Sequence, residues 1–143
     1  MRTKFSNPLK RQTKTTPYKE IPLESQEQIT LINWWELYSA TKHIHNKCLF
    51  AIPNGGFRNA RESHRFKQEG VRAGIPDLML SVPCGAFHGL FIELKRVKKG
   101  RVSEDQKEML VVLAKLGYKT IVCYGFEEAK KAIETYLGDY HAN

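Results

Sequence analysis

The sequence predicts a single-domain α/β fold, and three observations support this prediction. Segments with apolar residues at helical spacing alternate with short apolar runs bounded by glycine or proline, the pattern of alternating helices and strands. Two of these runs are separated only by a turn segment, which predicts a β-hairpin. The length of 143 residues suits one domain with one core.

The N-terminal half predicts a helix, a strand and a second helix. The first helix is expected over residues 22–40, with Pro22 in its first turn, or one turn later with a capping box made by Ser25 and Gln28. Its core-facing stripe is Leu31, Trp34, Trp35 and Tyr38. A short strand is expected over residues 47–52, a turn at Asn54-Gly55-Gly56, and a helix over residues 57–69 that Gly70 ends.

The C-terminal half predicts a hairpin, a helix, a strand and a last helix. The hairpin joins the runs 75–80 and 91–95 through a turn at 83–89. The next helix opens with a capping box between Ser103 and Gln106, and the strand 118–124 follows it. The core stripe of this helix is expected to be Met109, Leu110, Val112, Leu113 and Leu116. The last helix, residues 126–137, has Ala129, Ile133 and Leu137 on its buried side.

Two carboxylates are predicted to face each other across this hairpin. If its centre lies near Gly85, residues whose numbers add up to 170 are paired, and Asp77 lies opposite Glu93 with Cβ atoms about 5 Å apart. Like charges at that distance repel, and a divalent metal ion that takes carboxylate oxygens would remove the cost. Lys95 shares the face of Glu93, because alternate side chains of a strand point the same way. The alternative is an exposed, weak ion pair between Glu93 and Lys95.

Pro76-Asp77 followed by Glu93-Leu94-Lys95 resembles the PD-(D/E)XK pattern of a large nuclease superfamily. Within it, the chain resembles the stand-alone phage and bacterial members of the VRR-NUC family from about Pro22 to Leu137. The resemblance rests on four motifs in this order: residues 53–56 (PNGG), 70–78 (GVRAGIPDL), 88–95 (HGLFIELK) and 103–106 (SEDQ).

The resemblance implies a restriction-endonuclease-like αβββαβ core with a mixed central sheet flanked by helices, and an extra helix after the first strand. It also implies Mg²⁺, with Mn²⁺ as a substitute, bound by Asp77, Glu93 and the Leu94 carbonyl, with Glu24 of the first helix added and Glu27 as its rival. Lys95 would orient or deprotonate the attacking water, or stabilise negative charge in the transition state. Gln106 would help to arrange the site besides capping its helix.

A formal net charge of +8 favours a polyanionic partner, DNA above all. Residues 1–21 hold six basic residues against one acid and are expected to form a flexible arm that contacts phosphates or is simply a tail. Further phosphate contacts are expected from the second helix, the loops beside the hairpin and the PNGG turn. The expected residues are Asn54, Arg58, Arg61, Arg65, Arg72, Arg96, Lys98, Lys99 and Arg101.

The apolar runs and the cysteines of the sequence indicate in which compartment the protein works and which cofactors it lacks. No apolar run is long enough to span a membrane, and no apolar segment follows the basic start as in a secretory signal. Cys48, Cys84 and Cys123 lack metal or disulfide spacing and are interpreted as free thiols in the cytoplasm. We expect one nuclease domain over residues 22–138, a tail at 139–143, and no small-molecule cofactor.

The function predicted from the sequence is metal-dependent hydrolysis of DNA. Stand-alone VRR-NUC proteins resemble Holliday-junction resolvases, so the resemblance implies a homodimer that cuts branched DNA in phage or bacterial replication and repair. Trp34 or Trp35 is a candidate for the dimer interface. The alternatives are a nucleic-acid-binding module without cleavage and a sequence-specific restriction-type endonuclease.

Overall fold

A computed structural model of the chain describes residues 21–53, 59–138 and 140. Their elements follow in the predicted order: α1 (Glu24–Thr41), the short 3₁₀ turn η1 (Asn46–Cys48), β1 (Leu49–Ala51), α2 (Ala60–Gln68), β2 (Leu78–Leu80), β3 (Leu90–Lys95), α3 (Glu104–Lys115), β4 (Lys119–Tyr124) and α4 (Phe126–Leu137). The predicted α/β class is confirmed. Of the basic arm expected over residues 1–21, only Ile21 lies within the described residues.

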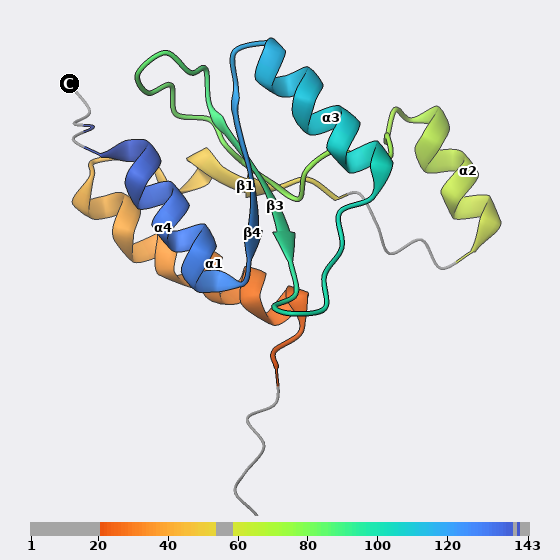
Figure 1. The fold of residues 1–143 in the computed structure, drawn as a ribbon, viewed down its shortest axis with the longest axis horizontal. Coiled ribbons are helices and arrows are strands. Elements are labelled where there is room, and N and C mark those ends of the chain that lie inside the picture. The colour runs from red at the N-terminus through yellow and green to blue at the C-terminus, as the bar shows by residue number, and fades with distance from the viewer. Residues whose placement is uncertain (1–20, 54–58, 139, 141–143) are drawn as a thin grey trace, which may run out of the picture.

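The four strands form one mixed sheet in the order β1-β2-β3-β4. β1 pairs with β2 and β2 with β3 in antiparallel fashion, whereas β4 runs parallel to β3. The parallel pair needs a crossover connection, and α3 provides it on one face of the sheet. α1 and α4 cover the other face, while α2 stands apart beside the sheet (Figure 1).

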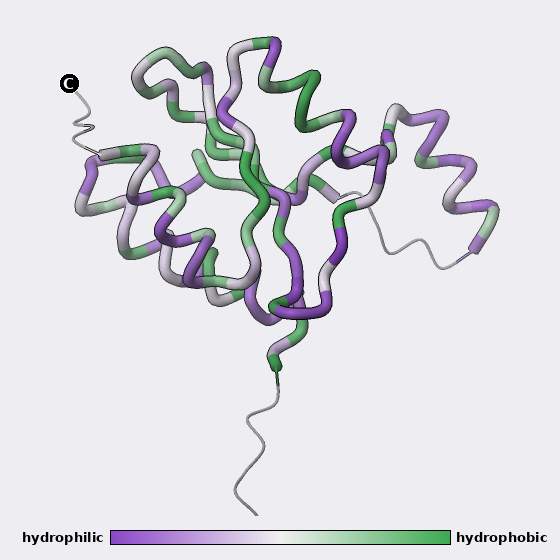
Figure 2. Tube along the Cα trace, in the orientation of Figure 1, coloured by the Kyte–Doolittle hydropathy of each residue, from purple (hydrophilic) through white to green (hydrophobic). Residues whose placement is uncertain are grey.

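The hydrophobic core lies between the sheet and the pair α1 and α4. Every residue of β3 is buried, as expected of a strand covered on both faces. α4 buries the three predicted positions, Ala129, Ile133 and Leu137. The apolar residues gather in the central strands, whereas α2 is mostly hydrophilic and has no buried residue (Figure 2).

Several boundaries and caps differ from the prediction. α1 begins at Glu24, and Gln26, not Gln28, accepts the backbone N–H of Leu23 (2.9 Å). Residues 46–48 form a 3₁₀ turn, in which the Asn46 carbonyl accepts the indole N–H of Trp35 (2.6 Å), and the first strand begins only at Leu49. The second helix begins at Ala60, with Asn59 as its cap.

The predicted apolar stripes are only partly buried. Leu31 and Trp35 are fully buried in α1, so Trp35 is not available for a dimer interface. On α3, Leu113 is buried, but Val112 and Leu116 are 40% and 60% exposed, contrary to the prediction. β4 is an edge strand, so α3 has no further strand to cover on that side.

Candidate active site

The hairpin register brings Asp77 opposite Glu93, as the sequence predicts. Leu78 pairs with Ile92 and Leu80 with Leu90, so the numbers of paired residues add up to 170. The ladder ends at Leu78, and Pro76, which precedes Asp77, has no backbone N–H to continue it. Asp77 Oδ2 instead accepts the backbone N–H of Leu94 (2.8 Å). The N–H and carbonyl of one residue in a strand point the same way, so the Leu94 carbonyl also faces this end of β2.

Glu93 is fully buried, which excludes the exposed ion pair as an explanation. Its Oε1 accepts hydrogen bonds from Lys95 Nζ and from Gln106 Nε2, each at 2.5 Å. Its Oε2 is buried and has no hydrogen-bond partner in the described part of the chain. Burial, together with the charge of Asp77, raises the pKa of Glu93 to about 7, although Lys95 opposes the shift.

Lys95 lies on the same face of β3 and is also buried. Burial alone would lower the pKa of Lys95, but the hydrogen bond and charge of Glu93, with smaller contributions from Glu24 and Asp77, raise it. The ammonium group therefore stays protonated at neutral pH. The turn after β3 packs directly on this residue: a Cβ atom on Gly100 would come within 2.6 Å of the Lys95 Cβ.

Gln106 makes the contacts that both of its suggested roles would require. The side-chain Oε1 of Gln106 accepts the backbone N–H of Ser103 (2.9 Å), and the backbone N–H of Gln106 donates to Ser103 Oγ (3.3 Å). The predicted capping box of α3 is therefore confirmed. The side-chain Nε2 of Gln106 is left to hold Glu93 Oε1. The first turn of α3 thus fixes one oxygen of the buried carboxylate.

The two acidic residues of α1 differ in what they contact. Glu27 accepts the backbone N–H of Phe126 (2.9 Å) and so caps α4. Glu24 makes no comparable hydrogen bond among the described residues, and its charge acts on Lys95. In the described chain no group of three or more His, Cys, Asp or Glu side chains is placed to hold a metal ion. The role of Glu24 as a further ligand stays a prediction.

The remaining donors nevertheless fit a hard divalent ion. Asp77 and Glu93 supply carboxylate oxygens, one of which is buried with no partner in the part of the chain that the structure describes, and the Leu94 carbonyl faces the same end of β2. Mg²⁺ is commonly bound by one or two carboxylates and keeps several waters. Two carboxylates and one carbonyl therefore suffice, and a positive ion would offset the burial and the repulsion from Asp77 that together raise the pKa of Glu93.

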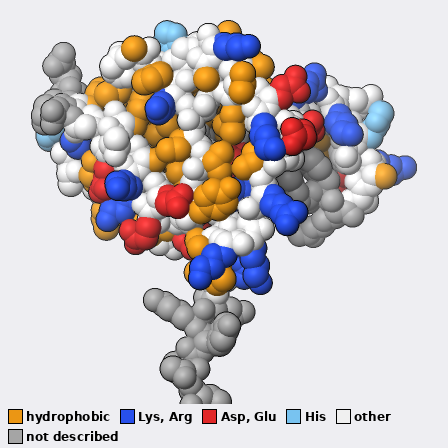
Figure 3. Space-filling view, in the orientation of Figure 1, with side chains coloured by type: hydrophobic (Ala, Val, Ile, Leu, Met, Phe, Trp, Pro, Cys, Tyr) orange, Lys and Arg blue, Asp and Glu red, His pale blue; other side chains and the backbone are white. Residues whose placement is uncertain are grey.

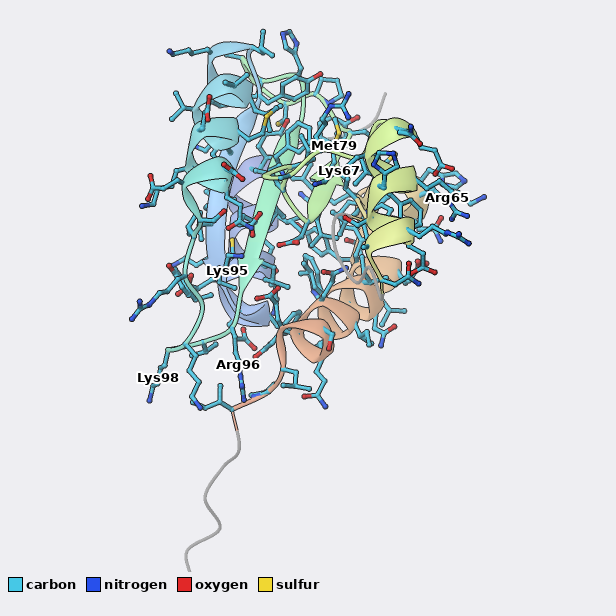
Figure 4. The ribbon with its side chains drawn as sticks, turned by 90° about the vertical axis from the view of Figure 1, so that its right-hand side faces the viewer. Arg65, Lys67, Met79, Lys95, Arg96 and Lys98 are labelled. Atoms are coloured by element: carbon cyan, nitrogen blue, oxygen red, sulfur yellow. The ribbon has the colours of Figure 1, made fainter. Side chains whose placement is uncertain are left out.

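The predicted phosphate-binding residues fall into four groups, the last of which is the pair Arg72 and Arg96. Asn54 and Arg58 lie outside the described residues. Arg61 and Arg65 are exposed on α2, and Arg65 pairs with Glu69 (3.4 Å) and points away from the sheet (Figure 4). The exposed residues Lys98, Lys99 and Arg101 lie in the loop that follows Lys95.

Two of the predicted arginines already bind the protein's own carbonyls. Arg96 donates to the carbonyls of Ile21 (2.6 Å) and Pro22 (3.0 Å), which ties the end of β3 to the start of α1. Arg72 donates to the Lys67 carbonyl (3.0 Å) and remains exposed. Arg96 therefore has a structural role that the sequence prediction did not include.

Sequence reasoning also missed the residues that position the site from a distance. Gly74 has φ +81°, and a Cβ atom there would lie 2.5 Å from the Asp105 carbonyl oxygen, so the loop before Asp77 packs against α3. The glycine itself was a signal, because a glycine three residues before a predicted site aspartate can indicate a close approach of two backbones. The cap that Glu27 provides joins residues 99 apart and has no local signal.

A buried and a half-buried carboxylate, with a buried lysine beside them at one end of the two central strands of a mixed sheet, form the kind of site that a hydrolase of the nuclease type requires. The sequence model of the VRR-NUC domain family matches residues 23–127 of the chain. The chain therefore belongs to the VRR-NUC family and carries a nuclease-type domain. A solved structure described as a VRR_NUC domain protein has 28% sequence identity and a TM-score of 0.67. The match covers 82% of this chain and 90% of that one. No curated protein matches.

No helix in the described part of the chain is both long and apolar enough to cross a membrane. The three cysteines are present as free thiols, and Cys123 is buried.

Proposed function

We propose that the protein is a metal-dependent endonuclease that hydrolyses phosphodiester bonds of branched DNA, as a homodimer, in phage or bacterial replication or repair. The observation that supports this proposal most strongly is the buried Glu93 Oε2, which has no hydrogen-bond partner among the described residues and lies next to Asp77 and Lys95. Leaving a buried polar group unsatisfied destabilises a fold by about 1–3 kcal/mol. A binding module without catalysis gains nothing that would offset this destabilisation.

Each residue of the site has a separate task. Asp77, Glu93 and the Leu94 carbonyl would hold Mg²⁺, or Mn²⁺ in its place. When bound, this ion supplies positive charge that polarises the phosphate and lowers the pKa of a water. Gln106 keeps Glu93 Oε1 in position, and Glu93 Oε2, which has no partner among the described residues, would be the oxygen left for the metal. The Leu94 N–H does the same for Asp77.

Lys95 is best suited to stabilise negative charge. Its raised pKa keeps it protonated, which disfavours the role of general base that the sequence leaves open. A buried ammonium group that can donate to a phosphate oxygen stabilises the charge that develops in the transition state. Losing such a preorganised donor typically slows the reaction by about 10²–10³-fold.

Branched DNA is preferred over a specific duplex sequence for two reasons. In the described chain every helix except α2 packs on the one sheet, so no separate recognition unit is present (Figure 1). The basic residues of α2 and of the loop after β3 suit phosphates, which carry no sequence information.

The test uses purified protein with labelled four-way junction, flap and linear duplex DNA, each in Mg²⁺, Mn²⁺ or EDTA. We expect the junction to be cut in either metal but not in EDTA, and Lys95→Ala to cut at least about 10²-fold more slowly. Lys47→Ala, an exposed lysine outside the site, is the matched control and should cut normally.

Three outcomes would contradict parts of the proposal. Normal cutting by Lys95→Ala would remove Lys95 from the site. Cutting of linear duplex at one sequence would indicate a restriction-type enzyme. Binding of all three DNAs without cutting in either metal would indicate a binding module.

A further inference from the structure

The free edge of β4 carries apolar residues that nothing in the described chain covers. Val112 and Leu116 of α3 flank it on one side and are 40% and 60% exposed, and Tyr124 at its end is 38% exposed. Hydrophobic side chains gather over α3 and in the middle of the face between α3 and α4 (Figure 3). An exposed apolar strand edge invites pairing with another strand.

The hydrogen-bonding groups of this edge follow from the β3–β4 register. The N–H groups of Lys119 and Gly125 donate to Gly89 and Lys95, so the odd-numbered residues of β4 face β3. The N–H and carbonyl groups of Thr120, Val122 and Tyr124 therefore point outward. The outward N–H of Tyr124 is already taken by Glu128 Oε2 (2.8 Å), a side chain of α4 that closes this end of the edge. Thr120 and Val122 are left with unpaired outward groups in the described chain.

We infer that this edge pairs with the same edge of a second copy of the chain. An antiparallel pairing about a two-fold axis at Ile121 places Thr120 of one copy opposite Val122 of the other. Each such pair exchanges two N–H···O bonds, so four bonds form, and the Tyr124 N–H that Glu128 holds is not needed. The inference rests on the homodimer in the proposed function and assigns its interface.

The charges along the edge are self-complementary under this axis. Lys119 begins β4, and Glu128 lies beside its end, so the two-fold brings Lys119 of each copy toward Glu128 of the other. Both residues line a hollow of about 600 Å³ between β4, α4 and the hairpin loop, and the half-buried Ile121 lines it too. This hollow leaves the α4 side of the edge open to the partner. On the α3 side, Val112 and Leu116 of the two copies would cover each other.

The interface predicts how the two sites are arranged. A two-fold axis perpendicular to the sheet gives one continuous eight-stranded sheet, with both Glu93 residues on the same face. Glu93 pairs with Val122, one residue from the axis. Three strand spacings of about 4.8 Å and two residue rises of about 3.3 Å then separate the two Glu93 Cα atoms by about 16 Å. Two sites on one face can act on two strands of one DNA molecule.

The first test measures the mass of the full chain in solution by light scattering. The native chain should have about twice the 16.5 kDa of one copy. Leu116→Glu should raise the dissociation constant of the dimer at least about 100-fold, because it buries an unpaired charge in the interface. Leu37→Glu is the matched control, since Leu37 is 77% exposed on α1, and it should leave the dimer intact. A monomeric native chain, or a dimer broken by Leu37→Glu and not by Leu116→Glu, would overturn the inference.

The second test determines the register by disulfide cross-linking. The background variant carries Cys48→Ser, Cys84→Ser and Cys123→Ala, and circular dichroism checks that it is folded. Ile121→Cys should cross-link two chains on mild oxidation, since residues opposite each other at the axis have Cβ atoms within disulfide range. Thr120→Cys and Val122→Cys should not, because each lies opposite the other and not opposite itself. Efficient cross-linking at 120 or 122 and not at 121 would refute this register. A native monomer that still cuts junction DNA would refute the interface and leave the nuclease proposal standing.

Discussion

The two faces of β3 are equally buried but have opposite chemistry. Toward α1 and α4 the strand presents Leu90, Ile92 and Leu94, each at most 1% exposed. Toward α3 it presents Phe91, Glu93 and Lys95, each at most 8% exposed. Burying apolar side chains stabilises the fold, whereas burying a charged pair often contributes nothing or costs stability. The comparison therefore separates the face that holds the protein together from the face that the proposed chemistry requires.

The largest expected effect comes from substitutions that test the two faces of β3 separately. Ile92→Ala should lower the free energy of unfolding by about 2–5 kcal/mol, because it opens a cavity in the core. The double variant Glu93→Met with Lys95→Met should change stability by less than about 1 kcal/mol, or raise it, because it replaces a buried ion pair by apolar side chains, yet it should abolish metal-dependent cutting. Urea unfolding in EDTA and junction cleavage measure the two effects. Equal destabilisation by both variants would mean that the pair of Glu93 and Lys95 is structural.

The second expected effect is a pH dependence that only the charged face produces. The pKa of Glu93 is raised to about 7 in the folded state, so the folded protein holds a proton that the unfolded chain releases. The resulting stabilisation is present below about pH 4.5 and is lost as the pH rises through 7. In EDTA, the native protein should lose about 1–3 kcal/mol relative to Glu93→Gln between pH 4.5 and pH 8.

Metal binding should show the opposite trend over the same interval. Deprotonated Glu93 is the ligand form, so Mg²⁺ should bind more weakly at pH 6 than at pH 8 and should release a proton when it binds at pH 6. Titration calorimetry in two buffers with different ionisation enthalpies measures that proton. Proton release that is the same at both pH values would show that Glu93 is not the titrating ligand.

The sequence predicts the charged face of β3 better than it predicts the contacts between distant elements that hold this face in place. Alternation along residues 91–95 and the turn at Gly85 predict both the facing of Asp77 and Glu93 and the correct register, because these depend on local spacing. α4 also matches its predicted range, since its three buried residues lie at a strict spacing of four. Each of these signals lies within one element or one hairpin.

The residues that hold the charged face in place act through contacts between elements far apart in the sequence. The cap that Glu27 gives to α4 and the hold of Arg96 on Pro22 join segments with no common local pattern. The exposed Leu116 was predicted to be buried, because helical spacing identifies an apolar face but not what covers it. The solvent-exposed face of α3 is decided by the sheet ending at β4, which no local pattern reveals.

The third expected effect separates the two roles of Gln106. Ser103→Ala removes the cap of α3 and should cost about 1 kcal/mol of stability, with little change in cleavage. Gln106→Ala removes the cap contact and also the hydrogen bond to Glu93, so it should cost a similar amount of stability but slow cleavage by about tenfold or more. Thermal unfolding and single-turnover cleavage compare the two variants. If both slowed cleavage equally, the contact with Glu93 would have no role of its own.

The smallest expected effect lies on α2, which belongs to neither face of β3. Arg61 is exposed and has no charged partner among the described residues, whereas Arg65 is paired with Glu69. If α2 contacts DNA phosphates, Arg61→Ala should weaken binding a few-fold and lower the slope of log affinity against log salt by about 1 for junction and duplex alike. Arg65→Ala should do less, because its charge is already partly neutralised by Glu69. Fluorescence anisotropy from about 50 to 200 mM salt measures both slopes. An unchanged slope for Arg61→Ala would exclude α2 from the DNA interface and confine phosphate binding to the loop that follows β3, beside the charged face.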